Sequence, residues 1–358
     1  MFRMLNRFAL ITVTLTLLLS CQSTKPRQNP ILETPAQVVT TLTKRIFKPF
    51  IGDEWIGKAI SYGPYREGQA PGEKGPSEEE ILQDLKILGE HWNLIRVYGS
   101  DDDSERVLRV IHEHKLPIKV MLGIWLSNEI VHPHQLQNNQ SQVKRGIDLA
   151  NRFPDEVIAI NVGNETQVFW SSHRMDPDNL IRYIREVRRH TKVPVTTADD
   201  FNFWNKPESH KVTAELDFIV MHGYALWNGQ QLDHAMEWTD SIYQDIKSKH
   251  SDLTIVFGET GWATVYNPDK KQPWEQGALI KGEVSLQAQE KFITELNQWI
   301  EKTHVVTFLF EAFDEPWKGG GSETGPTEVE KNWGVFYEDR TPKPSFQNYL
   351  ESLKTGNN

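Results

Sequence analysis

The sequence contains a single cysteine, Cys21, in 358 residues. One cysteine excludes an intramolecular disulfide, and its place near the N-terminus excludes a cysteine nucleophile or a cysteine-based zinc site in the rest of the chain. The chain also lacks the G-x-G-x-x-G motif that a nucleotide-binding open sheet needs after its first strand. No other metal or cofactor motif is visible, so we expect neither.

Basic residues are in the minority, with 39 Lys and Arg against 49 Asp and Glu and a formal net charge of −10. Binding of nucleic acid needs clustered positive charge, so a nucleic-acid partner is excluded, whereas a neutral polymer makes no such demand. Aromatic residues are plentiful, with 12 Trp and 16 Phe. They are enough for a sizeable core and leave some side chains free to bind a ligand.

The N-terminus has the pattern of an export signal. Arg3 and Arg7 precede an apolar run, 8–19, that is too short for a comfortable membrane span. The run ends in Leu-Leu-Ser-Cys at Cys21, which resembles a bacterial lipobox; an ordinary signal peptide with an incidental cysteine is the alternative. We expect residues 1–20 to be a lipoprotein signal peptide, Cys21 to carry lipid, and the polar segment 21–50 to be a tether. The expected location is the cell envelope, at the outer membrane or surface of a Gram-negative cell.

Short apolar runs alternate with longer amphipathic segments from Trp55 onward. A capping box at 77–80, an Asp-Pro pair at 176–177 and an apolar periodicity over 285–303 predict helices. The alternation predicts an α/β protein with a single (β/α)8 TIM barrel over residues 51–354, with a doubly wound open sheet as the alternative. The predicted strands are 57–61, 94–98, 118–122, 157–162, 193–197, 218–221, 254–257 and 305–310.

Carboxylates follow several of these strands, at the end of a (β/α)8 barrel where chemistry takes place. Glu165 follows the fourth strand, Glu259 the seventh and Glu315 the eighth. An acid in such a place is costly unless it is hydrogen-bonded or used, so Glu165 and Glu259 are predicted to be catalytic, while Glu315 could equally be a structural brace. Two carboxyls facing each other across the mouth, one protonated and one ionised, suit cleavage of a glycosidic bond with retention.

The residues around these carboxylates resemble glycoside hydrolase family 17, a member of clan A. The resemblance covers roughly residues 55–345 and rests on the runs 95–100, 162–165, 255–262 and 313–318. It implies cleavage of β-1,3-glucans, laminarin among them, without a cofactor. The family usually has proline after the Gly-Trp pair of the third run, where this chain has Ala263. The shape of the following loop, and hence endo or exo action, therefore stays open.

The resemblance also implies roles for individual residues. Glu165 is expected to be the acid/base and Glu259 the nucleophile, with Asn164 hydrogen-bonding the sugar 2-hydroxyl. Glu315 and Lys318 match a supporting pair that tunes the site electrostatically.

Aromatic residues and one histidine near the strand ends are candidates to contact substrate, and the resemblance makes Tyr98 and Tyr224 candidates to orient the nucleophile or line the cleft. An apolar ring face can stack on the C–H face of a pyranose, although packing under long loops is the alternative for each ring. The candidates are Tyr98, Trp125, Trp204, His222, Tyr224, Trp227, Trp262, Trp317 and Trp333.

The sequence thus favours a retaining hydrolase that acts on β-1,3-glucan polysaccharide or oligosaccharide, as a monomer attached to the membrane through lipid on Cys21. A β-1,3-glucan transglycosylase would use the same residues. A glucan-binding lipoprotein without activity should have lost one of the two carboxylates, and both Glu165 and Glu259 are present. A specificity for β-mannan or β-1,4-glucan is a further alternative.

Overall fold

The structure, a computed structural model, describes residues 42–270 and 276–355. The expected signal peptide, Cys21 and most of the expected tether lie outside these residues. No helix in the two described ranges is both long enough and apolar enough to span a membrane. Residues 42–50, which the sequence assigned to the tether, pack against the barrel. Their contacts include Phe47 stacked on Phe218 and the Arg45 amide bound to Asp217, which the sequence pattern does not reveal.

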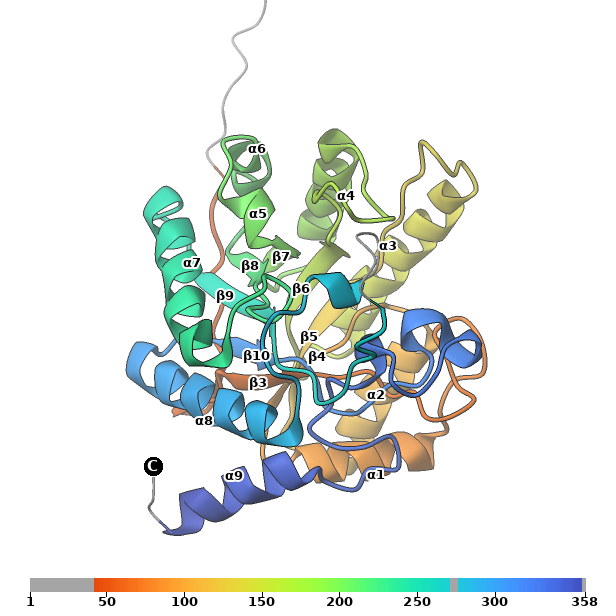
Figure 1. The fold of residues 1–358 in the computed structure, drawn as a ribbon. Coiled ribbons are helices and arrows are strands. Elements are labelled where there is room, and N and C mark those ends of the chain that lie inside the picture. Colours follow the sequence, from red (N-terminus) through yellow and green to blue (C-terminus); the bar gives the residue numbers. More distant parts are fainter. Residues whose placement is uncertain (1–41, 271–275, 356–358) are drawn as a thin grey trace, which may run out of the picture. The chain divides into compact units, whose positions relative to one another are not determined.

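Eight parallel strands close into a barrel in the order β10-β3-β4-β5-β6-β7-β8-β9, which confirms the predicted (β/α)8 fold (Figure 1). A two-stranded antiparallel pair, β1 (Phe50–Ile51) with β2 (Glu54–Trp55), precedes the barrel. The barrel strands are β3 (Lys58–Ser61), β4 (Leu94–Arg96), β5 (Lys119–Ile124), β6 (Val157–Asn164), β7 (Val195–Asp200), β8 (Ile219–His222), β9 (Ile255–Thr260) and β10 (Thr307–Leu309).

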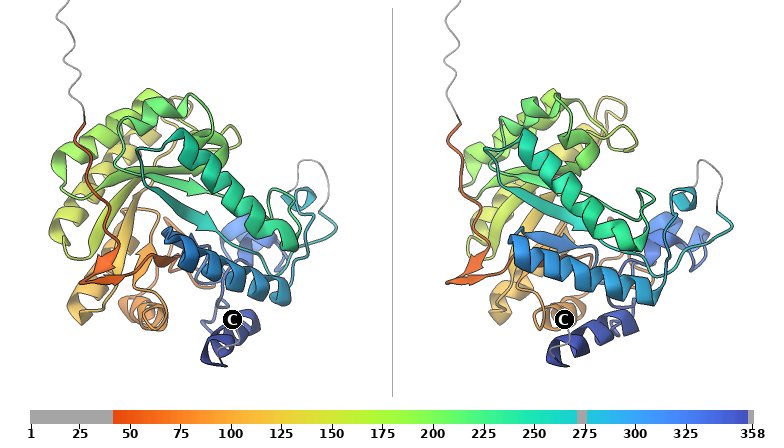
Figure 2. Two further views of the ribbon diagram at one scale, coloured as in Figure 1. Left: turned by 90° about the vertical axis from the view of Figure 1, so that its left-hand side faces the viewer. Right: turned by 60° about the vertical axis from the view of Figure 1, so that its left-hand side comes forward.

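Helices follow the strands and surround the barrel (Figures 1 and 2). The helix predicted from the capping box begins at the expected place, because Ser77 Oγ accepts from the Glu80 amide and the Glu80 side chain accepts from the Ser77 amide. The helices are α1 (Glu78–Leu88), α2 (Asp102–His114), α3 (Gln135–Arg152), α4 (Pro177–His190), α5 (Phe201–Trp204), α6 (Ser209–Thr213), α7 (Ala235–Lys249), α8 (Leu286–Thr303) and α9 (Pro344–Thr355).

Three strands run at least two residues beyond their predicted ends and finish in polar residues at the barrel mouth. β6, β7 and β9 run on to Asn164, Asp200 and Thr260. Ladder partners from neighbouring strands hold these polar ends in extended conformation: Asn164 pairs with Ala198, and Asp200 with His222. Hydrophobic periodicity cannot detect such residues, because backbone hydrogen bonds rather than apolar burial keep them in the sheet.

The apolar core has two parts. A small cluster fills the barrel interior below the mouth and includes Phe218, Val256 and Phe308. A larger cluster lies between the strands and the surrounding helices. Both parts are closely packed, so the polar residues at the strand ends are carried on a rigid frame.

Candidate active site

The backbone places Glu165 in an unusual conformation directly after β6. Its φ is 50°, in the left-handed region that a residue with a side chain rarely adopts. The Glu165 amide donates to the Ala198 carbonyl at 2.9 Å, and the Gln167 amide donates to Asp199 Oδ2 at 2.8 Å. These bonds tie the turn to β7 and hold the strained residue in place, which is typical of functional sites.

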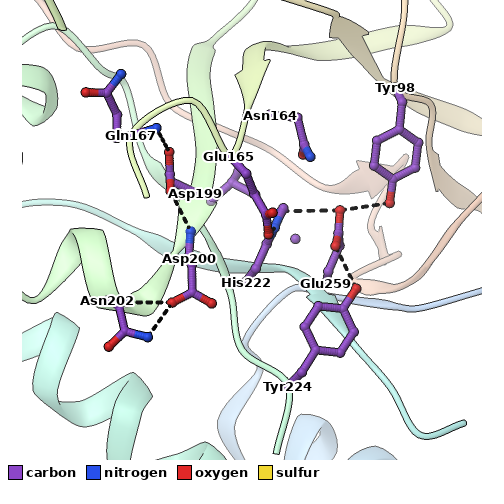
Figure 3. A network of polar contacts seen from close by, with 12 residues as sticks. Tyr98, Asn164, Glu165, Gln167, Asp199, Asp200, Asn202, His222, Tyr224 and Glu259 are labelled. Atoms are coloured by element: carbon purple, nitrogen blue, oxygen red, sulfur yellow. Dashed lines mark hydrogen bonds and ion pairs between the residues drawn. The ribbon is translucent and has the colours of Figure 1, made fainter. Parts of the chain in front are cut away.

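Glu259, near the end of β9, lies in a cage of donors (Figure 3). Its Oε1 accepts from Arg96 Nη1 at 2.9 Å and from the Tyr98 hydroxyl at 3.0 Å. Its Oε2 accepts from the Tyr224 hydroxyl at 2.6 Å. Burial opposes ionisation, but attraction by His222 and Arg96 and the two tyrosine hydrogen bonds outweigh it, and the pKa of Glu259 is held below its ordinary value. The site therefore keeps this carboxylate ionised.

His222, the last residue of β8, connects the two predicted catalytic carboxyls (Figure 3). Its Nδ1 lies 2.8 Å from Glu165 Oε1, and its Nε2 lies 3.4 Å from Glu259 Oε1. One oxygen of Glu165 and one of Glu259 lie within 4.8 Å of each other and of the histidine. The His222 side chain is 0% exposed, so the structure gives it a positioning role in place of the substrate contact that the sequence suggested.

Arg96, at the end of β4, is a component of the site that the sequence did not single out. Its guanidinium is completely buried, and besides Glu259 it binds Asn164 Oδ1 at 2.6 Å. Arg96 therefore links Asn164, whose amide is expected to meet the sugar 2-hydroxyl, to Glu259, the carboxylate expected to be the nucleophile. The available signal was an arginine in the middle of the predicted apolar strand 94–98, because Arg is rarely buried without partners.

The predicted supporting pair is present but has a third member. Lys318 Nζ lies 2.6 Å from Glu315 Oε2 and 2.5 Å from Glu311 Oε2, and Trp317 Nε1 donates to Glu315 at 3.0 Å. Burial opposes ionisation of Glu315, but Lys318 holds its pKa below the ordinary value. Burial, together with the charge of Glu315, raises the pKa of Glu311. Sequence reasoning missed Glu311, although only Phe310 separates it from the end of β10.

Two further carboxyls, Asp199 and Asp200, lie at the end of β7 on the Glu165 side of the site (Figure 3). Asp200 begins α5, since its Oδ1 accepts from the Asn202 amide at 2.8 Å. Burial is the main cause that raises the pKa of Asp200 to about 6, with Glu165 adding to the shift. Sequence reasoning missed both residues because the predicted strand stopped short of them.

The aromatic candidates separate into two groups. Trp204 and Trp262 are 0% and 1% exposed, so they pack beneath the loops and cannot present a ring face to a polymer. Their indole N–H groups donate to backbone carbonyls, of Asp199 for Trp204 and of Glu283 for Trp262. Tyr224 and Trp333 are also buried. The second group is partly exposed and consists of Tyr98, Trp125, Trp227 and Trp317.

Glu165, His222 and Glu259 together offer ligand atoms of the kinds that bind a metal ion, within 4.8 Å of one another. Arg96 Nη1 already lies 2.9 Å from Glu259 and 3.1 Å from His222 Nε2. A second cation there would be repelled by the guanidinium. The hydrogen-bond geometry thus fits an acid, a base and their positioning groups better than a metal centre.

Comparison with known proteins identifies the family to which the barrel belongs. The BtgE/BtgC glycoside hydrolase domain matches residues 59–334. The btgC protein of Aspergillus niger, which carries the name of a glucan endo-1,3-beta-glucosidase, is 30% identical over 296 residues, covering 75% of this chain and 40% of its own length. A glucan 1,3-beta-glucosidase of Schizosaccharomyces pombe is 26% identical over 280 residues, covering 74% of this chain and 79% of its own.

Among solved structures, an endo-laminarinase from Formosa has the same fold, with a TM-score of 0.71 at 24% identity over 83% of this chain and 88% of that one. Because the matched domain extends over nearly the whole barrel, the chain belongs to the BtgE/BtgC glycoside hydrolase domain family. It spans about 40% of the length of the btgC relatives it matches.

Proposed function

We propose that this protein is a retaining glycoside hydrolase of the family 17 type that cleaves β-1,3-glucan. The observation that carries the proposal is the carboxyl pair, with oxygens of Glu165 and Glu259 within 4.8 Å of each other. Retaining enzymes hold their carboxyls about 5 Å apart, whereas inverting enzymes need roughly 6.5 Å or more to admit a water. The names of the curated relatives supply the substrate class.

The two carboxyls have different surroundings, which suits different roles. Glu259 is caged by Arg96 and two tyrosines and kept ionised, so it attacks the anomeric carbon. The Glu165 side chain is 26% exposed at the mouth and donates its proton to the leaving oxygen. In the second step Glu165 takes a proton from water, the water attacks the same carbon, and the bond to Glu259 breaks.

The direct test is a polysaccharide panel assayed for new reducing ends, comparing laminarin, lichenan, cellulose and mannan. Activity that requires β-1,3 linkages is expected, with laminarin the best substrate. Activity confined to cellulose or mannan would contradict the proposed specificity. Mass spectrometry of the products separates hydrolysis, which gives only shorter oligomers, from transglycosylation, which also gives longer ones.

We further propose that Cys21 is lipidated and anchors the enzyme in the cell envelope of a Gram-negative bacterium. The support is the lipobox-like run before this lone cysteine and the polar segment after it. Replacement Cys21→Ser should release the protein into a soluble fraction. A variant that stays with the membrane would contradict lipid anchoring without bearing on the catalytic proposal.

A further inference from the structure

The loop between β6 and α4, which begins with Glu165, exposes two large apolar rings. Phe169 is 73% exposed and Trp170 is 49% exposed, only four and five residues after Glu165. Their rings meet edge to face, with centroids 4.8 Å apart and an interplanar angle of 82°. Each ring therefore steadies the other while keeping apolar surface in water, which is an unfavourable arrangement unless something covers it.

The base of this loop is firmly attached although its tip is exposed. Val168 and Met175 are 3% and 4% exposed, and the Met175 amide donates to the Thr166 carbonyl at 2.9 Å. The Gln167 amide is bound to Asp199, and Asn128 in the preceding loop donates to the Arg174 carbonyl. The two rings are thus held on a built support, as a preorganised binding surface requires.

The direction of the loop decides which part of a substrate it can meet. Figure 3 shows Gln167 on the side of Glu165 that faces away from Glu259. The sugar that becomes attached to the enzyme lies over Glu259, and the oxygen protonated by Glu165 belongs to the leaving sugar. The loop beyond Gln167 is tied to β7 through Asp199 and to the loop after β5 through Asn128, whereas Glu259 lies on β9, so the loop leaves the site on the Glu165 side.

We infer that Phe169 and Trp170 form a platform on which a pyranose of the leaving-group side stacks, and that the same platform holds the acceptor sugar if the enzyme transfers. The inference rests on the proposed function and adds to it the location of a subsite. A pyranose suits the surface, because its C–H face covers an apolar ring while its hydroxyls stay in water. Stacking of this kind needs no charged group on the ligand, which agrees with a neutral glucan.

The test compares Trp170→Ala and Phe169→Ala with the wild-type enzyme on two substrates. Laminarihexaose can place glucose units on the leaving-group side, whereas a nitrophenyl β-laminaribioside has only the aryl group there. The ratio of kcat/KM on the hexaose to kcat/KM on the aryl glycoside should fall on the order of tenfold for Trp170→Ala, since one buried ring face is lost. Trp170→Phe should restore part of the ratio. The matched control is Phe50→Ala, an exposed aromatic ring of β1 that is 45% exposed, which should leave the ratio unchanged.

A second measurement does not depend on turnover. The Kd of laminarihexaose for Glu259→Ala should rise by a similar factor when Trp170→Ala is added. An unchanged ratio, an unchanged Kd, or an equal loss on both substrates would overturn the platform while leaving the proposed function intact. A wild-type enzyme that cleaves neither substrate would instead overturn the proposed function, and the platform with it.

Discussion

The two ends of the barrel are built in different ways. At the N-terminal end of the strands, Phe47 stacks on Phe218 with ring centroids 4.5 Å apart. Nearby, the Asp217 carboxylate accepts from the backbone amides of Arg45 and Val195 at 2.7 Å each and from Arg188. Apolar surface is buried there and the charged group is fully hydrogen-bonded, which is the arrangement expected where only stability matters.

The mouth of the barrel, by contrast, keeps groups that stability alone would not favour. Glu165 has a left-handed backbone, and Arg96 is completely buried among polar partners. Burial raises the pKa of Asp200 to about 6, so this carboxyl resists ionisation in the fold. The rigid N-terminal end of the barrel thus allows the mouth to hold unfavourable charges in a fixed geometry. Changes at the mouth should therefore alter rate, and changes at the opposite end should alter stability.

Removal of Glu165 or Glu259, the two carboxyls proposed to be catalytic, should give the largest effects. Glu259→Ala should lose at least about a thousandfold in turnover, because no covalent intermediate can form, and azide should restore activity with an α-glycosyl azide as product. Glu165→Ala should lose most on poor leaving groups and give a β-glycosyl azide, since azide then attacks the intermediate. Product anomers are read by NMR.

The supporting carboxylate provides the control for this assignment. Glu315→Gln should cost less than either catalytic variant, because Glu315 binds Lys318 and Trp317 and the proposed mechanism gives it no proton to transfer. Opposite azide anomers, or a Glu315 variant as inactive as Glu259→Ala, would mean that the carboxylates are wrongly assigned.

The opposite end of the barrel should show the reverse behaviour. Phe47→Ala removes a ring that is 9% exposed and stacked on Phe218, so the free energy of unfolding should fall by about 3 kcal/mol. Denaturant unfolding measures the loss, and kcat/KM of the folded variant should stay within about twofold of the wild type. A large loss of rate at unchanged stability would break the contrast between the two ends.

Arg96 offers a smaller and more specific effect on rate. Arg96→Met removes both the charge and the donors that help to lower the pKa of Glu259, so this pKa should rise. Because the proposed nucleophile has to be ionised to attack, the acidic limb of the kcat/KM profile should move to higher pH. At neutral pH the rate should fall by about one to two orders of magnitude.

Arg96→Lys is the matched control for charge, since it keeps the cation but cannot bind Glu259 and Asn164 with one planar group. It should retain most of the position of the acidic limb while still losing rate. If both variants left the limb in place, Arg96 would have no electrostatic role at the nucleophile.

The smallest effect is expected from Asp200. Its folded pKa of about 6 lies above the ordinary value of 3.8, so its contribution to stability is fully present below pH 3.8 and is lost as the pH rises through 6. Asp200→Asn stays neutral and keeps the acceptor for the Asn202 amide. Its melting temperature relative to wild type should therefore rise between pH 4 and pH 7, by about 4 °C. The exposed control Asp53→Asn should show no such trend.

Sequence reasoning identified the two carboxyls and named Tyr98, Tyr224 and His222 as candidates near them, but it missed Arg96 and several neighbouring acids. Glu165 and Glu259 stand out because each falls at the end of an apolar, β-branched run, where an acid is conspicuous. Asp199 and Asp200 extend β7 beyond its apolar pattern, and only pairing with β8 shows that they belong to the strand. The sequence pattern indicated Glu315 as the supporting carboxylate and did not reveal Glu311, although Lys318 binds both.

The aromatic residues illustrate the same limit. Trp204 and Trp262 follow strands, as a cleft residue should, but the loops fold over them and bury them. Phe169 and Trp170 carry no periodic signal, and only the structure shows that they are exposed in the loop that follows Glu165. Position along the chain indicates which loop holds a ring, whereas its exposure depends on how neighbouring loops pack.

The sequence by itself determined the barrel and the placement of Glu165 and Glu259, because strand–helix alternation and the direction of parallel strands bring all strand ends to one mouth. Only the tertiary structure decided that Arg96, Tyr98, Tyr224 and His222 converge on these carboxyls from β4, β8 and the loops that follow these two strands. Those contacts depend on barrel closure, which joins segments up to 163 residues apart, as between Arg96 and Glu259. Local sequence patterns do not show which residues meet at that separation along the chain, whereas the strand register of a closed sheet fixes these pairs.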